Sequence, residues 1–228
     1  MKNVIFIAPP AAGKGTISDY LVKNFNYVHL STGDMLRSEV ASGSLLGKEI
    51  DALISKGSLV SDELIIKLVE SKLKNELFGK LFILDGFPRT LPQAEKLDEM
   101  LISMGVTNNV VIYLDVTLEE ATKRAVGRIV CPKCSRSYNV YYKEASPLIE
   151  SICDDCGVVL EKRSDDTEET FKKRYQTYLD STSPIINYYK QKGILESINV
   201  MRTQNEVAKD ILSVINDENV SVKRRKSD

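Results

Sequence analysis

The chain has 228 residues, of which 31 are lysine or arginine and 32 are aspartate or glutamate, so its formal net charge is −1. This balance excludes a general electrostatic attraction to nucleic acid or to anionic membranes. The length suits one α/β core with small inserted subdomains. There is no apolar run of about 18 residues, and an apolar stretch begins close to Met1, so we expect a soluble, cytoplasmic protein without a signal peptide.

Short apolar runs alternate along the chain with segments of helical periodicity. The runs predict strands at residues 4–7, 28–30, 81–84, 110–114 and 195–200. Strands buried on both faces and separated by helices are typical of a doubly wound, three-layer αβα fold with a five-stranded parallel sheet. Helix starts are indicated by two capping-box patterns and one weaker relative, Thr90-x-x-Gln93, Thr117-x-x-Glu120 and Asp166-x-x-Glu169.

The first predicted strand leads into a loop that ends in the sequence GKGT at 13–16. Apolar residues then recur at helical spacing, which predicts a helix from about Thr16. A glycine-rich loop between a strand and a helix directs backbone N–H groups at a phosphate, and Lys14 adds a mobile cation. We therefore predict a triphosphate-binding P-loop, although Ala8 occupies the place of the first glycine in the usual pattern. A glycine-rich turn without this role is the alternative.

A second candidate for phosphate chemistry is the sequence DGFPR at 85–89, directly after the third predicted strand. Asp85 would lie at the carboxyl end of a central strand, where its carboxylate can orient water on Mg²⁺. Arg89 follows a turn set by Gly86 and Pro88 and can direct a bidentate donor into the same crevice. An ordinary ion pair at a strand end is the alternative.

The four cysteines form two close pairs, Cys131-x-x-Cys134 and Cys153-x-x-Cys156. Because each short turn directs two thiolates at one point, the array predicts a tetrahedral zinc site. Four sulfur ligands leave no open position, so the metal would be structural. Free thiols and disulfides are the alternatives, and iron or cobalt can occupy the same ligands.

Six stretches together resemble the bacterial adenylate kinases with a long, zinc-binding lid, within the nucleoside monophosphate kinase family. They are PPAAGKGT, LSTGDMLR, KGSLVSDELI, LDGFPRTLPQAE, residues 124–128 and RSDDTEETFKKR. The resemblance covers residues 1–215 and implies reversible, Mg²⁺-dependent transfer of the γ-phosphoryl group of ATP to AMP, which gives two ADP. We further expect a monomer that binds neither nucleic acid nor membranes.

Two segments fit the alternation of strands and helices poorly, and we expect them to be mobile subdomains that close over the crevice. Residues 31–60 would bind the nucleoside monophosphate, and residues 128–164 would form the zinc-bearing lid. The core would comprise residues 1–30, 61–127 and 165–216. Residues 217–228 contain the basic cluster KRRK and predict a disordered tail, with a nucleic-acid or lipid contact as the alternative.

The resemblance also implies the residues that contact each substrate. The ATP site would consist of Pro10, Ala11, Ala12, Gly13, Lys14, Gly15, Thr16, Arg124, Arg128, Arg202 and the lid backbone at Ser137 and Tyr138. The AMP site would consist of Thr32, Arg37, Leu59, Val60, Gly86, Phe87, Arg89, Gln93, Arg163 and Arg174. The cations that hold the charge of the transferring phosphoryl group would be Lys14, Arg89, Arg128, Arg163 and Arg174.

The residue types agree with this assignment on the AMP side. Thr32 follows a predicted strand and Arg37 comes about one helical turn later, so a hydroxyl and a guanidinium can meet one phosphate. The amide of Gln93 can both donate to and accept from an adenine edge. The alternative is that Arg37 and Gln93 are ordinary exposed helix residues.

Three further polar residues are assigned less direct places. The resemblance implies that acids such as Asp165 and Asp166 pair with lid arginines in the closed state. Asp165 is therefore expected to clamp Arg128 or Arg163, while the alternative of an acid that stabilises a helix N-terminus through the helix dipole suits Asp166. His29, the only histidine, lies inside an apolar strand and is expected to be a packed core residue without a catalytic role.

The phosphate loop departs from the pattern G-x-P-G-x-G-K-G-T of the family, because Ala8 and Ala11 replace two glycines. Glycine is favoured at such positions because the backbone takes an unusual φ or approaches phosphate closely, so a methyl group adds about 1 kcal/mol of strain or lifts the loop slightly. We therefore expect activity with weakened ATP affinity that glycine would restore. Arg202 stands where the family tends toward a glycine and a lysine near the adenine. Rival readings are a kinase for UMP, CMP or GMP, and a nucleotide-binding sensor with impaired turnover.

Overall fold

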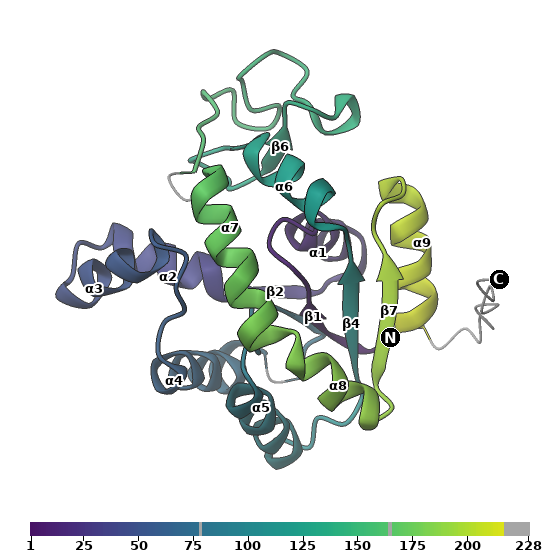
Figure 1. The fold of residues 1–228 in the computed structure, drawn as a ribbon. Helices are drawn as coiled ribbons and strands as arrows, with labels where there is room; N and C mark the ends of the chain where they lie inside the picture. Colours follow the sequence, from purple (N-terminus) through teal and green to yellow (C-terminus); the bar gives the residue numbers. More distant parts are fainter. Residues whose placement is uncertain (78, 164–165, 217–228) are drawn as a thin grey trace.

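In the computed structural model, residues 1–77, 79–163 and 166–216 are described, and the predicted tail at 217–228 lies outside them. A five-stranded parallel sheet forms the centre (Figure 1), in the order β2-β3-β1-β4-β7. Its strands are β1 Asn3–Ile7, β2 Val28–Ser31, β3 Phe82–Asp85, β4 Asn109–Asp115 and β7 Leu195–Asn199. The predicted α/β fold and all five predicted strands are therefore confirmed, each within about two residues.

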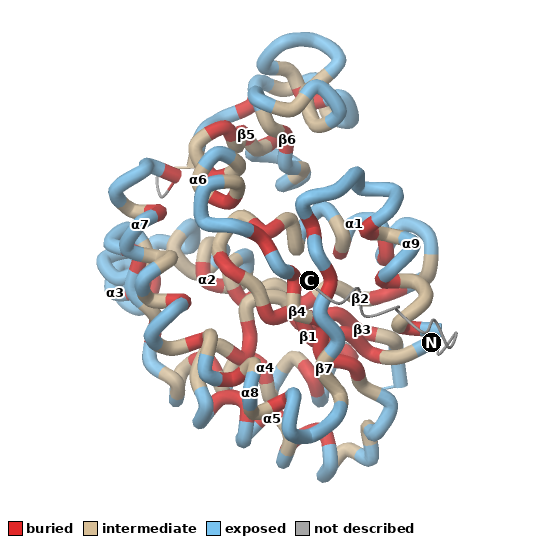
Figure 2. Tube along the Cα trace, turned by 45° about the vertical axis from the view of Figure 1, so that its right-hand side comes forward, coloured by how far each residue is buried: buried red, intermediate tan, exposed pale blue. Residues whose placement is uncertain are grey.

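The sheet is buried because its strands carry apolar side chains on both faces. Every residue of β1 is buried, with Val4 and Phe6 in one apolar cluster and Ile5 and Ile7 in the other. Successive side chains of a strand point to opposite faces, so this alternation places helices on both sides. Figure 2 shows the buried residues concentrated along the central strands.

Two layers of helices cover the sheet. One face packs against α1 Lys14–Phe25, α6 Leu118–Val126 and α9 Gln204–Ile215. The other packs against α4 Asp62–Lys72, α5 Leu91–Ser103 and α8 Pro184–Gln191. None of the described helices has the length and apolar run that a membrane crossing requires.

The two segments predicted as subdomains project from this core (Figure 1). In the first, α2 Thr32–Ala41 and α3 Leu45–Ile54 pack closely, because Gly47 lets the backbone of α3 approach Glu39. In the second, β5 Arg128–Val130 and β6 Ser137–Asn139 pair antiparallel over a small apolar cluster. The division into domains and the mobility of these segments stay predictions.

The remaining elements connect these parts. They are the π-helical segments at Leu73–Leu77 and Tyr178–Thr182, the 3₁₀ turn at Lys143–Ala145 and α7 Glu168–Thr177.

Side chains cap the helices largely where the sequence patterns indicate. The Oγ1 atoms of Thr90 and Thr117 accept backbone N–H groups at the starts of α5 and α6, as predicted. The predicted start at Asp166 is wrong by one residue, because the cap of α7 is Thr167. A reciprocal capping box that the sequence analysis missed joins Thr203 and Glu206 at the start of α9.

Candidate active site and metal centre

The carboxyl ends of three neighbouring strands bring the phosphate loop, Asp85 and Thr32 to one edge of the sheet. β1 pairs with β3 so that Phe6 lies opposite Asp85, and β2 pairs with β3 so that Ser31 lies opposite Asp85. The chain reverses its direction of winding at β1, which has β3 on one side and β4 on the other. Ligands of open α/β sheets bind at such switch points.

The loop between β1 and α1 has the conformation of a phosphate cradle. Helix α1 begins at Lys14, two residues before the predicted start, and Gly13 caps it with a φ of 93° that favours glycine. Ala11 also has a left-handed φ, of 61°, which confirms the unusual backbone predicted there. Ala8 has no positive φ, so a close approach to the phosphate stays the predicted reason for a glycine at that position. The free N–H groups at the start of α1 can thus receive a phosphate.

Lys14 and Asp85 form the polar centre of this edge. Lys14 Nζ lies 3.9 Å from Asp85 Oδ1. Burial lowers the pKa of Lys14, and Asp85 offsets only part of that effect. Burial also opposes ionisation of Asp85, but Lys14, His29 and Arg89 outweigh it and hold the pKa of Asp85 below its usual value. The lowered pKa of Asp85 keeps its carboxylate ionised at neutral pH.

His29 corrects an expectation from the sequence. Its side chain is partly exposed rather than part of the core, and Nε2 lies 3.4 Å from Asp85 Oδ2 without hydrogen-bond alignment. The register of β2 against β3 explains this position, because it sets the carboxyl ends of both strands side by side.

Arg89 is held at the bottom of the crevice by the turn before it. Its Nε donates to the backbone oxygen of Gly86 over 2.7 Å, and its own backbone oxygen accepts from Thr182 Oγ1 over 2.9 Å. Burial and the nearby cation Arg174 lower the pKa of Arg89 to about 10, which still leaves it charged at neutral pH. Gly86, with a φ of 82°, cannot accept a side chain, because a Cβ there would come within 2.8 Å of Arg89 Nη2.

Asp166 joins two of the predicted arginines. Its carboxylate accepts from Arg128 Nε and Nη2 over 2.6 and 2.5 Å, and Arg174 Nη1 lies 3.5 Å away. The side chain of Asp166 is 1% exposed. The pairing of an acid with a lid arginine, which the resemblance implies at 165–166, is thus found at Asp166. Asp165 itself lies outside the described residues.

Arg124 lies beside the phosphate loop. Its Nη2 donates to the backbone oxygen of Val200 over 2.9 Å, and its Nε pairs with Glu120 over 2.8 Å. A Cβ built on Gly13 would lie 3.9 Å from Arg124 Nη1, so the guanidinium borders the loop. Arg163 precedes the gap in the described residues, and its backbone oxygen accepts from Asp166 N over 3.2 Å.

On the side predicted for AMP, hydrogen bonds already occupy several of the polar groups. Thr32 is buried and its Oγ1 donates to the backbone oxygen of Gly86 over 2.9 Å. Gln93 is buried in a network at the start of α5, while Arg37 pairs with Asp34 on the surface over 2.5 Å. The alternative that both are ordinary exposed helix residues is thus wrong for Gln93. It stays open for Arg37, whose side chain is 39% exposed.

A cleft at this edge brings part of the predicted site together. Its walls are formed by Phe6, Ile7, Ala8, Pro10, Lys14, Gly57, Leu59, Gly86, Pro88, Arg89, Arg174, Thr177, Tyr178 and Thr182. Val60 and Phe87 are buried and do not line this cleft. Sequence reasoning assigned Arg174 of α7 but missed Thr177, Tyr178 and Thr182, which follow it and carry no motif.

Gly57 is a missed position whose signal was available, because it lies in the stretch KGSLVSDELI. Its φ of 78° favours glycine, and a Cβ there would lie 3.0 Å from Arg174 Cγ. The backbone oxygen of Gly57 also accepts from Thr177 Oγ1 over 3.3 Å. The end of the 31–60 segment thus packs directly against α7 and sets the position of Arg174.

Three residues predicted for ATP lie away from this cleft. Ser137 is exposed on β6, and the Tyr138 side chain is buried in the lid, where its hydroxyl donates to Cys153 Sγ over 3.6 Å. The predicted contact of their backbone with the adenine stays a prediction. Arg202 bonds at the surface to Asp210 and to the backbone oxygen of Asn199.

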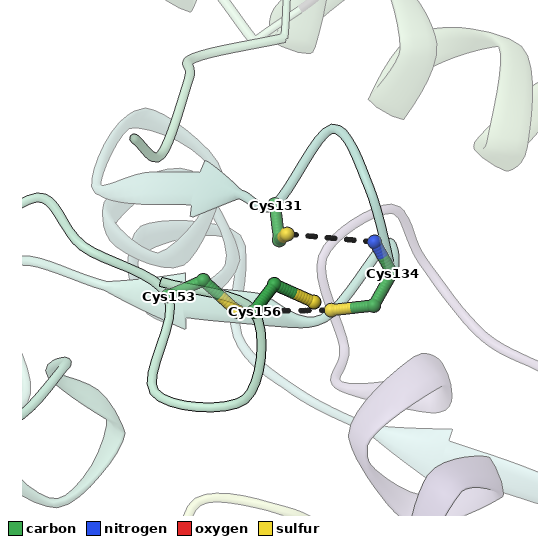
Figure 3. A group of neighbouring side chains, drawn as sticks. All are labelled: Cys131, Cys134, Cys153 and Cys156. Carbon is green, nitrogen blue, oxygen red and sulfur yellow. Dashed lines mark hydrogen bonds between the residues drawn. The ribbon is translucent and has the colours of Figure 1, made fainter. Parts of the chain in front are cut away.

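The four cysteines converge on one point of the lid (Figure 3), from the loops 131–134 and 153–156. Their sulfur atoms all lie within 4.8 Å of one another, and those of Cys134 and Cys153 are 3.7 Å apart. A tetrahedral zinc with sulfur at about 2.3 Å requires sulfur pairs at roughly 3.8 Å. All four thiols are free in the structure, so the disulfide alternative is not met. The residues therefore fit a tetrahedral thiolate-bound metal.

Comparison with known proteins decides among the kinases that share this architecture. A family model described as "Adenylate kinase" matches residues 6–194. The chain belongs to the adenylate kinase family. The adenylate kinase of Thermosipho africanus is 41% identical over 213 residues, which cover 93% of this chain and 99% of that protein. Adenylate kinases of Fervidobacterium nodosum and Archaeoglobus fulgidus are 42% and 43% identical, each over 93% of this chain and 97% of the relative. The predicted family and fold are confirmed.

Proposed function

We propose that this adenylate kinase transfers the γ-phosphoryl group of MgATP reversibly to AMP, giving two ADP, at the cleft beside the phosphate loop. The observation that carries the proposal is the convergence of Lys14, Arg89 and Arg174 on one cleft next to the N-terminus of α1. Phosphoryl transfer gives a protein little covalent work, so cations aimed at the oxygens supply most of the catalysis.

The phosphate loop would bind the triphosphate of ATP. The N–H groups at the start of α1 point into the loop, and Gly13 gives the backbone the left-handed turn that exposes them. Lys14 would contact the β- and γ-phosphates through its terminal nitrogen. Arg124, at the border of the loop, would add a second cation on this side.

The arginines around Asp166 would hold the phosphoryl group in transit. Asp166 fixes the guanidinium groups of Arg128 and Arg174 in adjacent positions, which saves the reorganisation that free side chains would need. Arg89 faces the same cleft from the other side and would bind the phosphate of AMP. Arg163 and Arg37 complete the proposed set. Among the described residues that line the cleft there is no aspartate, glutamate or histidine, so no general base is proposed.

Mg²⁺, which adenylate kinases use with ATP, neutralises phosphate charge when bound. Asp85 suits the orientation of its water shell, because oxygen is the ligand that Mg²⁺ prefers and the lowered pKa keeps the carboxylate ionised. Lys14 and His29 hold this carboxylate at the strand end, so it would be in place before ATP arrives.

The four lid thiolates would hold a structural zinc ion. All four ligand positions are sulfur, which leaves no open position for chemistry. The lid cluster contains only a few buried apolar residues, among them Ile129, Tyr138 and Leu160. A subdomain with so small a core gains much of its stability from a bound metal. Zinc would thus keep the lid rigid while it closes over ATP.

The protein would act as a cytoplasmic monomer. Four free cysteines grouped as metal ligands suit a reducing compartment, where disulfides do not persist. The segments 31–60 and 128–164 would close over the cleft to exclude water from the γ-phosphate until AMP is bound.

The test is ADP formation from MgATP with AMP, CMP, UMP or GMP as the acceptor. We expect fast turnover with AMP and little with the others. A Lys14→Met variant should lose about 10²–10³-fold in kcat, the range for removing one preorganised donor. Preference for another monophosphate would contradict the substrate assignment, and ATP binding without turnover would favour the nucleotide sensor.

A further inference from the structure

Asp62 connects the N-termini of two neighbouring helices on the AMP side of the cleft. It is the first residue of α4, which lies beside α5 (Figure 1). Its Oδ2 accepts from Thr90 Oγ1 over 2.8 Å, and its Oδ1 accepts from Gln93 Nε2 over 2.7 Å. Thr90 in turn caps α5. One carboxylate thus holds both the cap of α5 and the side chain of Gln93.

Two partners of fixed chemistry determine which way the Gln93 amide points. The backbone N–H of Arg89 can only donate, and it lies 2.7 Å from Gln93 Oε1. The carboxylate of Asp62 can only accept, and it meets Nε2. Rotation of the amide by 180° would break both bonds and oppose donor to donor and acceptor to acceptor. Because Gln93 is 2% exposed, water cannot replace the lost partners, and such unpaired buried groups are unfavourable.

An amide held in one orientation offers a nucleobase one defined pattern of hydrogen-bond donor and acceptor. After these two bonds, Nε2 retains one N–H and Oε1 retains one lone pair. Adenine presents the complement, since its 6-amino group donates and its ring nitrogen N1 accepts. Hypoxanthine and guanine present the reverse at the same atoms, with O6 as acceptor and N1–H as donor. In the same pose, these 6-oxopurines would meet Gln93 with like groups opposed.

We infer that Asp62 is a positioning residue that sets the preference of the monophosphate site for a 6-aminopurine over a 6-oxopurine. It acts through Gln93 and does not contact the base. The inference rests on the proposed function, which places Gln93 at the adenine of AMP. It goes beyond that function by assigning the direction of the amide, and hence the specificity, to a residue on another helix.

The test compares AMP with IMP as acceptors, because these two nucleotides differ only at position 6 and at the protonation of N1. The variant Asp62→Ala removes the acceptor opposite Nε2. We expect the ratio of kcat/KM for AMP to that for IMP to fall by about tenfold or more, as for the loss of one buried hydrogen bond to a charged group. KM for AMP should rise several-fold, while KM for ATP should stay within about twofold of the wild-type value.

Glu63→Ala is the matched control. Glu63 is the next residue of the same helical turn, and its exposed side chain pairs only with Lys67 among the described contacts. The control removes one acid from the start of α4 without touching Gln93, so the AMP/IMP ratio should not change. Asp62→Asn, which keeps an oxygen opposite Nε2, should restore most of the selectivity that Asp62→Ala loses.

The outcomes separate the inference from the function beneath it. If the wild-type protein does not prefer AMP to IMP, the proposed AMP specificity is wrong. If the wild type prefers AMP but Asp62→Ala lowers both rates equally, Asp62 has only a structural role and the inference fails. Should Asp62→Ala not fold by circular dichroism, Asp62→Ser carries the same test, because serine is favoured at helix N-termini and is too short to reach Gln93.

Discussion

Replacing Ala11 with glycine should stabilise the protein, whereas replacing Ala8 should not. Ala11 has a φ of 61°, in the left-handed region, and Ala8 does not have a positive φ. A residue with a Cβ loses about 1–2 kcal/mol in the left-handed region. Glycine relieves this strain at Ala11, but at either site it also makes the unfolded chain more flexible, which lowers stability by about 0.4–1 kcal/mol.

Comparing the two variants isolates the strain. Both replace alanine with glycine in one loop, and both methyl groups pack against the same apolar cluster. The entropy of the unfolded chain and the lost methyl contact therefore largely cancel. The difference in free energy of unfolding between Ala11→Gly and Ala8→Gly should be about 1–2 kcal/mol in favour of Ala11→Gly.

The assay is thermal and urea unfolding of the three proteins, followed by circular dichroism. For a chain of this size, 1 kcal/mol corresponds to roughly 2–4 °C in Tm, so the two variants should differ by roughly 2–8 °C. Equal Tm values for Ala11→Gly and Ala8→Gly, or a lower value for Ala11→Gly, would refute the assignment of strain to Ala11.

Three further predictions follow from the site. Burial lowers the pKa of Lys14 below its usual 10.5, so kcat/KM for ATP should fall as pH rises through the lowered pKa. Lys14→Arg should shift this alkaline fall in the pH–rate profile to higher pH. An unshifted profile would contradict the assignment of the fall to Lys14. In the window between the lowered pKa and 10.5 the unfolded state binds more protons, so Lys14 should make stability rise with pH, opposite to activity. Asp166→Ala should reduce the free energy of unfolding by about 1–3 kcal/mol in urea, since it removes the bidentate carboxylate from Arg128. The loss should shrink in an Arg128→Ala background, and additive losses would disprove the coupling. Chelation of the metal should unfold the lid before the core. Hydrogen exchange should then speed up first in residues 128–163 alone. If lid and core unfolded together in a single transition, the lid would not be held by zinc.

The strands were predictable because the signal for a buried strand lies in a few consecutive residues. Each is a run of apolar, often β-branched residues, and burial on both faces of a parallel sheet requires no finer pattern. The cysteine cluster was predictable for a similar reason, since two turns with fixed spacing each bring two sulfurs together. The phosphate loop followed from its position between a strand and a helix.

The remaining features depend on contacts between distant parts of the chain. Asp166 was taken for a helix-capping acid, because its partner Arg128 lies 38 residues earlier and no local pattern joins them. His29 reaches Asp85 only through the register of two strands. The bond from Gln93 to Asp62 spans 31 residues and two helices, so the sequence showed a useful amide but not its orientation.

The most direct test of the central claim follows the transferred atoms. ATP labelled at its γ-phosphorus is mixed with unlabelled AMP, Mg²⁺ and the purified protein, and the labelled products are separated during the first turnovers. The account predicts that the label moves from ATP into the β-position of ADP, with one AMP consumed for each labelled ADP and no release of inorganic phosphate above the rate without protein. Label that appears as inorganic phosphate, or that stays in ATP while AMP is bound, would contradict it.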